Sequence, residues 1–268
     1  MKNNKINISN APIGIFDSGL GGLSICKEIV DLLPNESIIY LADSANTPYG
    51  EKTKEEIVQL CIKNTEYLLT LGCKMIVVAC NTATTNSITV LRDMFDVSFI
   101  GLEPATKPAA LQTKTGKIGV LATKGTLNSD LFLTTSSKYR GHLKIVEAEG
   151  INLVRLIEKG DLEATIPLLK QYLLPMIEEE VDNIVLGCTH YPFLIPFIKD
   201  IIPQNVAIID SGKAVAKQTL NVLRSEGLLN SSVSEVTRFF YTNGKQELLK
   251  AFLKKIELPS NSVSFKYF

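Results

Sequence analysis

The stretch MIVVAC at residues 75–80 carries the clearest signal of the fold. It is a short apolar run without polar alternation, which is typical of a parallel strand that is buried on both faces. Similar runs begin at residues 13, 37 and 98, and segments of helical character, such as 54–71, lie between them. Strands that alternate with helices predict a parallel sheet with helices on its faces.

The same series of runs appears a second time. Apolar runs begin at residues 118, 144, 183 and 206, with spacings of 26, 39 and 23, against 24, 38 and 23 in the first half. Matched spacings indicate two copies of one supersecondary unit, although apolar runs can also agree in spacing by chance. We therefore expect an α/β fold of two pseudo-symmetric domains, each a mainly parallel sheet flanked by helices.

The tail of the chain sets the expected domain limits. Two strand-like runs, at 238–242 and 263–268, follow the second copy and are predicted to return to the first sheet. The first domain is therefore expected to be discontinuous, with residues 1–104 plus 210–268, and the second to comprise 105–209.

The composition excludes several classes of protein. The 268 residues include 28 Lys+Arg and 28 Asp+Glu, and 45% are hydrophobic, which is ordinary for a globular chain. Without clustered positive charge we expect no nucleic-acid partner. No apolar run approaches the ~20 residues of a membrane span, and the polar residues 1–12 do not have the pattern of a secretory signal. Five scattered cysteines suit a reducing compartment, so the predicted location is the cytoplasm.

Two cysteines occupy equivalent places in the two copies. Cys80 and Cys188 each end the third apolar run of their half, and each is followed by polar residues. Ligands of open α/β sheets bind beyond the carboxyl ends of the strands, so facing units would place both thiols in one interdomain cleft. Helices are predicted to begin at Asn81 and Thr189, where free N–H groups favour a thiolate, and the ordinary thiol pKa of ~8.5 needs only a modest downward shift. The remaining cysteines are interpreted as packing residues: Cys26, Cys61 and Cys73.

Other kinds of site are poorly supported. The chain has no C-x-x-C pair, and only two histidines, His142 and His190, so we expect no zinc site. The sequence GLGG at 19–22 lacks the G-x-G-x-x-G spacing of a dinucleotide site, and no Walker A sequence is present. We interpret GLGG as a tight turn that lets backbone N–H groups approach an anion.

Four motifs then identify a resemblance. IGIFDSGLGGL at 13–23, ADSANTPYG at 42–50, ACNT at 79–82 and GCTHYP at 187–192 resemble, in this order, the cofactor-independent glutamate racemases, over about residues 13–212. The resemblance implies two pseudo-symmetric α/β domains with the active site between them. It also implies a cytoplasmic isomerase that interconverts L- and D-glutamate without cofactor or metal and supplies D-glutamate for peptidoglycan, cell-wall biogenesis and cell shape. It is compatible with a homodimer.

The resemblance assigns roles to particular residues. Cys80 and Cys188 would be the two acid/base groups, with Asp17 assisting Cys80 and His190 assisting Cys188. Glu158, in LVRLIE at 153–158, would be a supporting carboxylate, although the preceding GIN at 150–152 departs from the Cys-Pro sequence common in the family. The implied substrate contacts are Asp17, Ser18, Tyr49, Gly50, Asn81, Thr82, Thr123, Thr189 and His190.

Two alternatives remain at this stage. An aspartate racemase of the same superfamily would share the paired cysteines, although PYG at 48–50 and THYP at 189–192 favour glutamate. A non-catalytic amino-acid-binding module would also suit an interdomain cleft, but it has no need for two cysteines. None of the five arginines lies within the four motifs, so we expect backbone amides and small hydroxyls to bind the substrate carboxylates.

Overall fold

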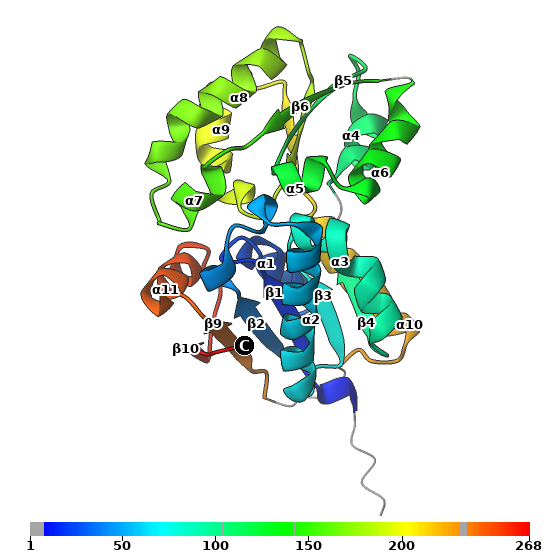
Figure 1. Cartoon of the computed structure of the whole chain (residues 1–268), viewed down its shortest axis with the longest axis vertical. Helices are drawn as coiled ribbons and strands as arrows, with labels where there is room; N and C mark the ends of the chain where they lie inside the picture. Colours follow the sequence, from blue (N-terminus) through cyan, green and yellow to red (C-terminus); the bar gives the residue numbers. More distant parts are fainter. Residues whose placement is uncertain (1–7, 103, 142, 231–234) are drawn as a thin grey trace, which may run out of the picture.

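Two parallel sheets form the frame of the molecule, one above the other in Figure 1. The computed structural model describes residues 8–102, 104–141, 143–230 and 235–268, so His142 lies outside the described residues. One sheet has six strands in the order β10-β9-β2-β1-β3-β4, and the other has four in the order β6-β5-β7-β8. Every strand pair in both sheets is parallel. The predicted α/β class is confirmed.

The inner strands of the six-stranded sheet are fully buried, which explains their unbroken apolar sequences. In the register, Ile13 pairs with both Ile38 and Met75. The strands are β1 (Ile13–Asp17), β2 (Ile38–Ala42), β3 (Met75–Val78), β4 (Ser98–Gly101), β9 (Arg238–Thr242) and β10 (Ser262–Phe265).

The four-stranded sheet repeats the inner part of the first one. Its order β6-β5-β7-β8 has the same connectivity as β2-β1-β3-β4. The strands are β5 (Lys117–Ala122), β6 (Lys144–Glu149), β7 (Asn183–Gly187) and β8 (Ala207–Ile209). The duplication inferred from strand spacing is therefore confirmed, and β3 and β7, which precede the two cysteines, are equivalent strands.

Helices cover the faces of both sheets (Figure 1). In the lobe of the six-stranded sheet they are α1 (Leu23–Leu32), α2 (Lys54–Thr70), α3 (Asn81–Met94), α10 (Gly212–Ser225) and α11 (Gln246–Lys255). In the other lobe they are α4 (Thr106–Gln112), α5 (Lys124–Leu127), α6 (Asp130–Arg140), α7 (Leu153–Ile157), α8 (Ile166–Glu178) and α9 (Ile195–Ile201). Short 3₁₀ turns are η1 (Ile8–Asn10), η2 (Ser44–Asn46), η3 (Tyr49–Glu51), η4 (Glu163–Thr165) and η5 (Tyr191–Leu194).

The helix predicted at 54–71 begins at a capping box. Glu56 N–H donates to Thr53 Oγ1 at 3.2 Å, and Thr53 N–H donates to Glu56 Oε2 at 2.8 Å. Two of the free N–H groups at the helix start are satisfied in this way. The cap fixes where α2 leaves the loop that carries Tyr49 and Gly50.

The chain returns from the second lobe to the first, as its tail predicted. After β8, α10 packs on α1, and β9 and β10 then join the six-stranded sheet. A buried ion pair holds this return at the amino ends of the strands: Lys74 Nζ lies 2.6 Å from Glu36 Oε2 and 2.9 Å from the Leu228 carbonyl, and Glu36 also accepts from Asn230 N–H. A buried charge needs such full pairing. The domain limits of 1–104 plus 210–268 and 105–209 stay a prediction.

One apolar cluster continues from the first lobe into the second. It includes Leu20 and Leu23 from one lobe and Leu153, Ile157 and Tyr191 from the other. The two lobes are therefore packed against each other beside the site. Within the described ranges, none of the helices has both the length and the apolar character needed to cross a bilayer.

Candidate active site

Both cysteines line one cleft between the lobes. Cys80 follows β3 and Cys188 follows β7, so each lies at the carboxyl end of its strand, as predicted. The cleft is lined by Ser18, Pro48, Tyr49, Gly50, Cys80, Asn81, Thr82, Thr123, Val154, Cys188 and His190. Pro48 and Val154 were not expected, although both lie within sequences quoted above. The other three cysteines, Cys26, Cys61 and Cys73, are buried in the first lobe, and burial raises the pKa of each to about 12.

Cys80 is held entirely by its own lobe. It is the N-cap of α3, where Ala83 N–H lies 3.4 Å from its sulfur, and Ser18 Oγ lies 3.7 Å from the same atom. The predicted helix start at Asn81 is confirmed. The expected downward pKa shift is not found, because burial and then the Asp17 carboxylate raise the pKa of Cys80 well above its ordinary value. These two effects outweigh the helix N–H, so Cys80 is a neutral thiol.

Cys188 begins a row of polar groups that ends in the other lobe. Its sulfur lies 3.7 Å from His190 Nδ1, and His190 Nε2 lies 2.6 Å from Glu158 Oε1. Glu158 Oε1 also accepts from Leu20 N–H at 2.5 Å. Burial opposes the imidazolium, but the bonds to Cys188 and Glu158 raise the pKa of His190 well above its ordinary value. Cys188, His190 and Glu158 thus form a row in which a carboxylate orients a histidine beside a thiol.

The GLGG turn explains how this row reaches the first lobe. A Cβ added to Gly19 would lie 2.1 Å from Glu158 Oε1, and one added to Gly21 would lie 2.3 Å from His190 Nδ1. Only glycine permits such close approach at these two positions. The sequence interpretation of an anion-binding turn is confirmed, and the anion is the carboxylate of Glu158.

The predicted helix start at Thr189 is wrong. Residues Tyr191–Leu194 form the 3₁₀ turn η5, and the α-helix α9 begins only at Ile195. Pro192 and Pro196 remove two backbone donors from this segment. Cys188 therefore does not cap an α-helix as Cys80 does, and its polar partner is a side chain, His190.

Asp17 lies behind the cleft and connects the lobes. It is fully buried; its Oδ1 accepts from Gly19 N–H at 2.7 Å and its Oδ2 from Thr189 Oγ1 at 3.0 Å. Burial is the main cause that raises the pKa of Asp17. Asp17 thus binds Gly19 of its own lobe and Thr189 in the turn of Cys188, whereas the hydroxyl beside Cys80 belongs to Ser18.

The remaining expected contacts lie where the lobes meet. Thr82 Oγ1 lies 2.8 Å from Thr123 Oγ1 across the cleft, and a Cβ on Gly50 would lie 2.9 Å from Thr123 Cβ. The Tyr49 hydroxyl donates to Asp43 at 2.5 Å and is not free for a ligand. Asn81 is different, because its buried Nδ2 has no hydrogen-bond partner among the residues that the structure describes. A buried unpaired donor calls for a ligand or water.

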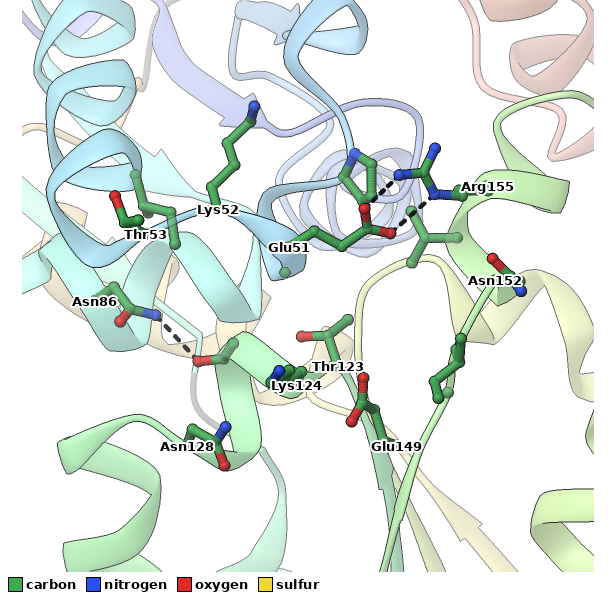
Figure 2. A pocket seen from close by; sticks show the side chains of 17 residues that line it. Glu51, Lys52, Thr53, Asn86, Thr123, Lys124, Asn128, Glu149, Asn152 and Arg155 are labelled. Carbon is green, nitrogen blue, oxygen red and sulfur yellow. Dashed lines mark hydrogen bonds and ion pairs between the residues drawn. The ribbon is translucent and has the colours of Figure 1, made fainter.

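The cleft is closed, and a larger cavity adjoins it. The free space between the thiols is ≈ 10 Å³, about that of one water molecule. The adjoining cavity measures ≈ 530 Å³ and shares Pro48, Gly50, Thr123 and Val154 with the cleft. At its rim Arg155 Nε donates to Glu51 Oε1 at 2.9 Å, and a second guanidinium nitrogen contacts the other carboxylate oxygen (Figure 2). We interpret the larger cavity, which an ion pair between the lobes spans, as the entrance to the cleft.

The site contains no evident arrangement for a metal ion. Among the residues that the structure describes, His, Cys, Asp and Glu nowhere form a group of three or more that could hold one.

Comparisons with known proteins agree on one family. The model of the Asp/Glu/Hydantoin racemase family matches residues 13–219. A glutamate racemase of Herpetosiphon aurantiacus is 46% identical over 239 residues, covering 88% of this chain and 94% of that protein. The crystal structure of a glutamate racemase from Bacillus anthracis has a TM-score of 0.85 at 31% identity, covering 97% of this chain and 98% of that one. A glutamate racemase of Escherichia coli, crystallised with L-glutamate and an activator, gives 0.84 at 31% identity, covering 95% and 98%.

Proposed function

Because this chain belongs to the Asp/Glu/Hydantoin racemase family, we propose that it interconverts L- and D-glutamate by proton transfer between Cys80 and Cys188. The observation that carries the proposal is the pair of thiols on equivalent strands of two lobes, both lining one closed cleft. Glutamate is favoured over aspartate because the similar proteins named above are glutamate racemases. A binding module would not require the second thiol.

Racemisation needs acid/base groups on both faces of the α-carbon. One group removes the α-proton and the other returns a proton to the opposite face, since a single base returns the original isomer. One thiol must therefore be ionised while the other is protonated, and the two exchange states in each turnover. Thiols at the ends of β3 and β7, in lobes that face each other, meet this requirement.

The charges around the two thiols favour Cys188 as the base in the first turnover. The raised pKa of Cys80 keeps it protonated, while His190, whose pKa is also raised, places a positive charge beside Cys188. Cys188 is then the base and Cys80 the acid. The resemblance assigns Cys188 to L-glutamate and Cys80 to D-glutamate. The state left after one turnover serves the reverse reaction.

The carbanion must be stabilised by the protein, since family members lack a cofactor to delocalise it. Backbone N–H groups at the start of α3, the unpaired Asn81 Nδ2 and the Thr82 and Thr123 hydroxyls are the donors that the cleft offers to a carboxylate. Such fixed dipoles act most strongly where water is excluded. The closed cleft, with room for about one water, provides that exclusion.

Substrate must enter by separation of the lobes, because an amino acid is several times larger than the free space between the thiols. The entrance cavity at the Glu51–Arg155 pair is the route that the geometry favours. The product, D-glutamate, would supply peptidoglycan and so cell-wall biogenesis and cell shape, in the cytoplasm. Association of the chain as a homodimer stays a prediction.

Exchange of the α-proton with heavy water tests the proposal. Protein shown by its absorption spectrum to be free of pyridoxal phosphate, and treated with a chelator, is incubated in D₂O with L-glutamate or L-aspartate. We expect deuterium at Cα of glutamate together with formation of the D-isomer. Exchange of aspartate alone would support the aspartate alternative, and binding without any exchange would support a binding module. Loss of activity on chelation, restored by metal, would contradict the cofactor-free mechanism.

A further inference from the structure

The turn that carries Cys188 is held in place by the opposite lobe. Thr189, the next residue, is buried, and two side chains of the first lobe contact it. Asp17 accepts from its hydroxyl at 3.0 Å, and Ser24 Oγ lies 2.9 Å from its carbonyl oxygen. Ser24 is half-buried in the first turn of α1, directly after the GLGG turn. Both groups of Thr189 that can form hydrogen bonds across the interface are therefore bound by the first lobe.

Ser24 has two acceptors for a single proton. Its Oγ also lies 2.9 Å from the carbonyl of Gly21, three residues earlier in its own lobe. The hydroxyl proton can serve either carbonyl by rotation about one bond. When the lobes separate, Ser24 keeps a partner in Gly21, and when they close it can donate to Thr189. Because the Ser24 hydroxyl has an acceptor in both the open and the closed state, closure leaves no buried donor unpaired. The free-energy cost of closing the lobes at this contact is therefore small.

The segment after Cys80 also contacts the opposite lobe, through the hydrogen bond of 2.8 Å between Thr82 Oγ1 and Thr123 Oγ1, but Ser24 takes no part in that contact. The groups that touch the sulfur of Cys80, Ser18 Oγ and Ala83 N–H, belong to its own lobe. Opening of the cleft leaves them in place. By contrast, the turn of Cys188 loses its contacts with Ser24 and Asp17 when the lobes separate, and Glu158 loses Leu20 N–H.

We propose that Ser24 is a positioning residue for Cys188: its hydroxyl binds the Thr189 carbonyl when the cleft closes and thereby aims the Cys188 thiol at the α-carbon. The proposal rests on the two-cysteine function proposed above. It predicts that loss of the hydroxyl impairs the step that Cys188 performs and spares the step that Cys80 performs.

The test uses a reaction that needs only one proton abstraction. In 3-chloroglutamate, removal of the α-proton leaves an electron pair that forms the Cα=Cβ bond and expels chloride. The resulting enamine becomes an imine and is hydrolysed to 2-oxoglutarate and ammonium, so 2-oxoglutarate measures abstraction alone. Cys188→Ser and Cys80→Ser, assayed with both isomers, establish which isomer each cysteine serves.

The variants are Ser24→Ala, Ser24→Thr and Ser225→Ala. Ser225 is the matched control, because its hydroxyl also bonds the carbonyl three residues earlier, at 3.0 Å, but lies exposed on α10. We expect Ser24→Ala to lower kcat/KM about tenfold for the isomer that Cys188 serves, as for one hydrogen bond made in full only in the closed state, and by less than about twofold for the other. Ser24→Thr should restore most of the loss, and Ser225→Ala should cause none.

Two results would overturn the proposal. Equal losses for both isomers would assign Ser24 a merely structural role, and no loss for either would remove it from the mechanism. The unfolding temperature of each of the three variants is measured to establish that the variant is folded under the conditions of the assay. Failure of the proposed function is seen separately, since the unmodified protein would then form no 2-oxoglutarate from either isomer.

Discussion

The two cysteines occupy equivalent positions in a duplicated fold, but their surroundings differ. Cys80 caps an α-helix and is held by Ser18 and Ala83 of its own lobe. Cys188 precedes a 3₁₀ turn, and its partner His190 is oriented by Glu158, which in turn binds the opposite lobe. Duplication places two thiols at equivalent strand ends in one cleft. Their surroundings differ in charge: burial and Asp17 raise the pKa of Cys80, whereas His190, whose own pKa is raised, lies beside Cys188.

The largest effects are expected from the cysteines themselves. Serine at either position raises the pKa of that base by several units, so Cys80→Ser and Cys188→Ser should each lower racemisation about a thousandfold or more. The loss should be equal in the two directions, because microscopic reversibility forbids a one-way catalyst. Circular dichroism of glutamate measures both directions. A variant that retained a tenth of the activity would remove that cysteine from the mechanism.

His190 should make the stability of the folded protein depend on pH. Its folded-state pKa is raised, so protonation stabilises the fold: the contribution is complete below the unfolded value of ~6.5 and is lost as pH rises through the folded value. The unfolding temperature of the unmodified protein should therefore fall on the alkaline side more than that of His190→Gln. Parallel curves for the two proteins would show that His190 is not an imidazolium in the resting state.

Glu158 is expected to act through His190 with a smaller effect. Glu158→Gln keeps the shape of the side chain but removes the charge, which should lower the pKa of His190 and reduce kcat about tenfold. The alkaline limb of the kcat profile should then move to lower pH. Glu178→Gln on the exposed face of α8 is the control for loss of a carboxylate. A tenfold loss without displacement of the pH profile would instead indicate a structural role.

The ion pair at the entrance should matter least. Arg155 and Glu51 are each about half exposed, at 52% and 53%, and such pairs contribute about 0–1 kcal/mol. Arg155→Ala and Glu51→Ala should therefore change KM by less than about threefold, and the double variant should resemble each single one. Steady-state kinetics at low and high salt measures this. A strong rise in KM for Arg155→Ala alone would mean that its guanidinium binds a substrate carboxylate.

The sequence was sufficient to predict features that depend on local pattern. The apolar runs located the strands, their spacing revealed the duplication, and equivalent strand ends placed Cys80 and Cys188 in one cleft. The GLGG turn was correctly interpreted as an anion contact, although its partner was not identified. Strands and turns could be predicted because they depend mainly on residues that are close together in the sequence.

Two features that depend on contacts distant in the sequence were missed, and one local element was assigned wrongly. The raised pKa of Cys80 depends on burial by the closed cleft, and the role of Ser24 depends on a carbonyl 165 residues away. The 3₁₀ turn after Thr189 was mistaken for a helix because an apolar segment with prolines near its start can also begin an α-helix. The pKa of Cys80 and the contact of Ser24 have no local signal in a single sequence, whereas Pro192 and Pro196 are a local signal for the 3₁₀ turn.

Elimination from the two isomers of 3-chloroglutamate by the two cysteine variants is the most direct test of the assignment of one cysteine to each face. Each elimination needs one abstraction, so the two faces are measured separately. Cys188→Ser should impair elimination from the L-isomer far more than from the D-isomer, and Cys80→Ser should do the reverse. Equal losses for both isomers in both variants would contradict the account.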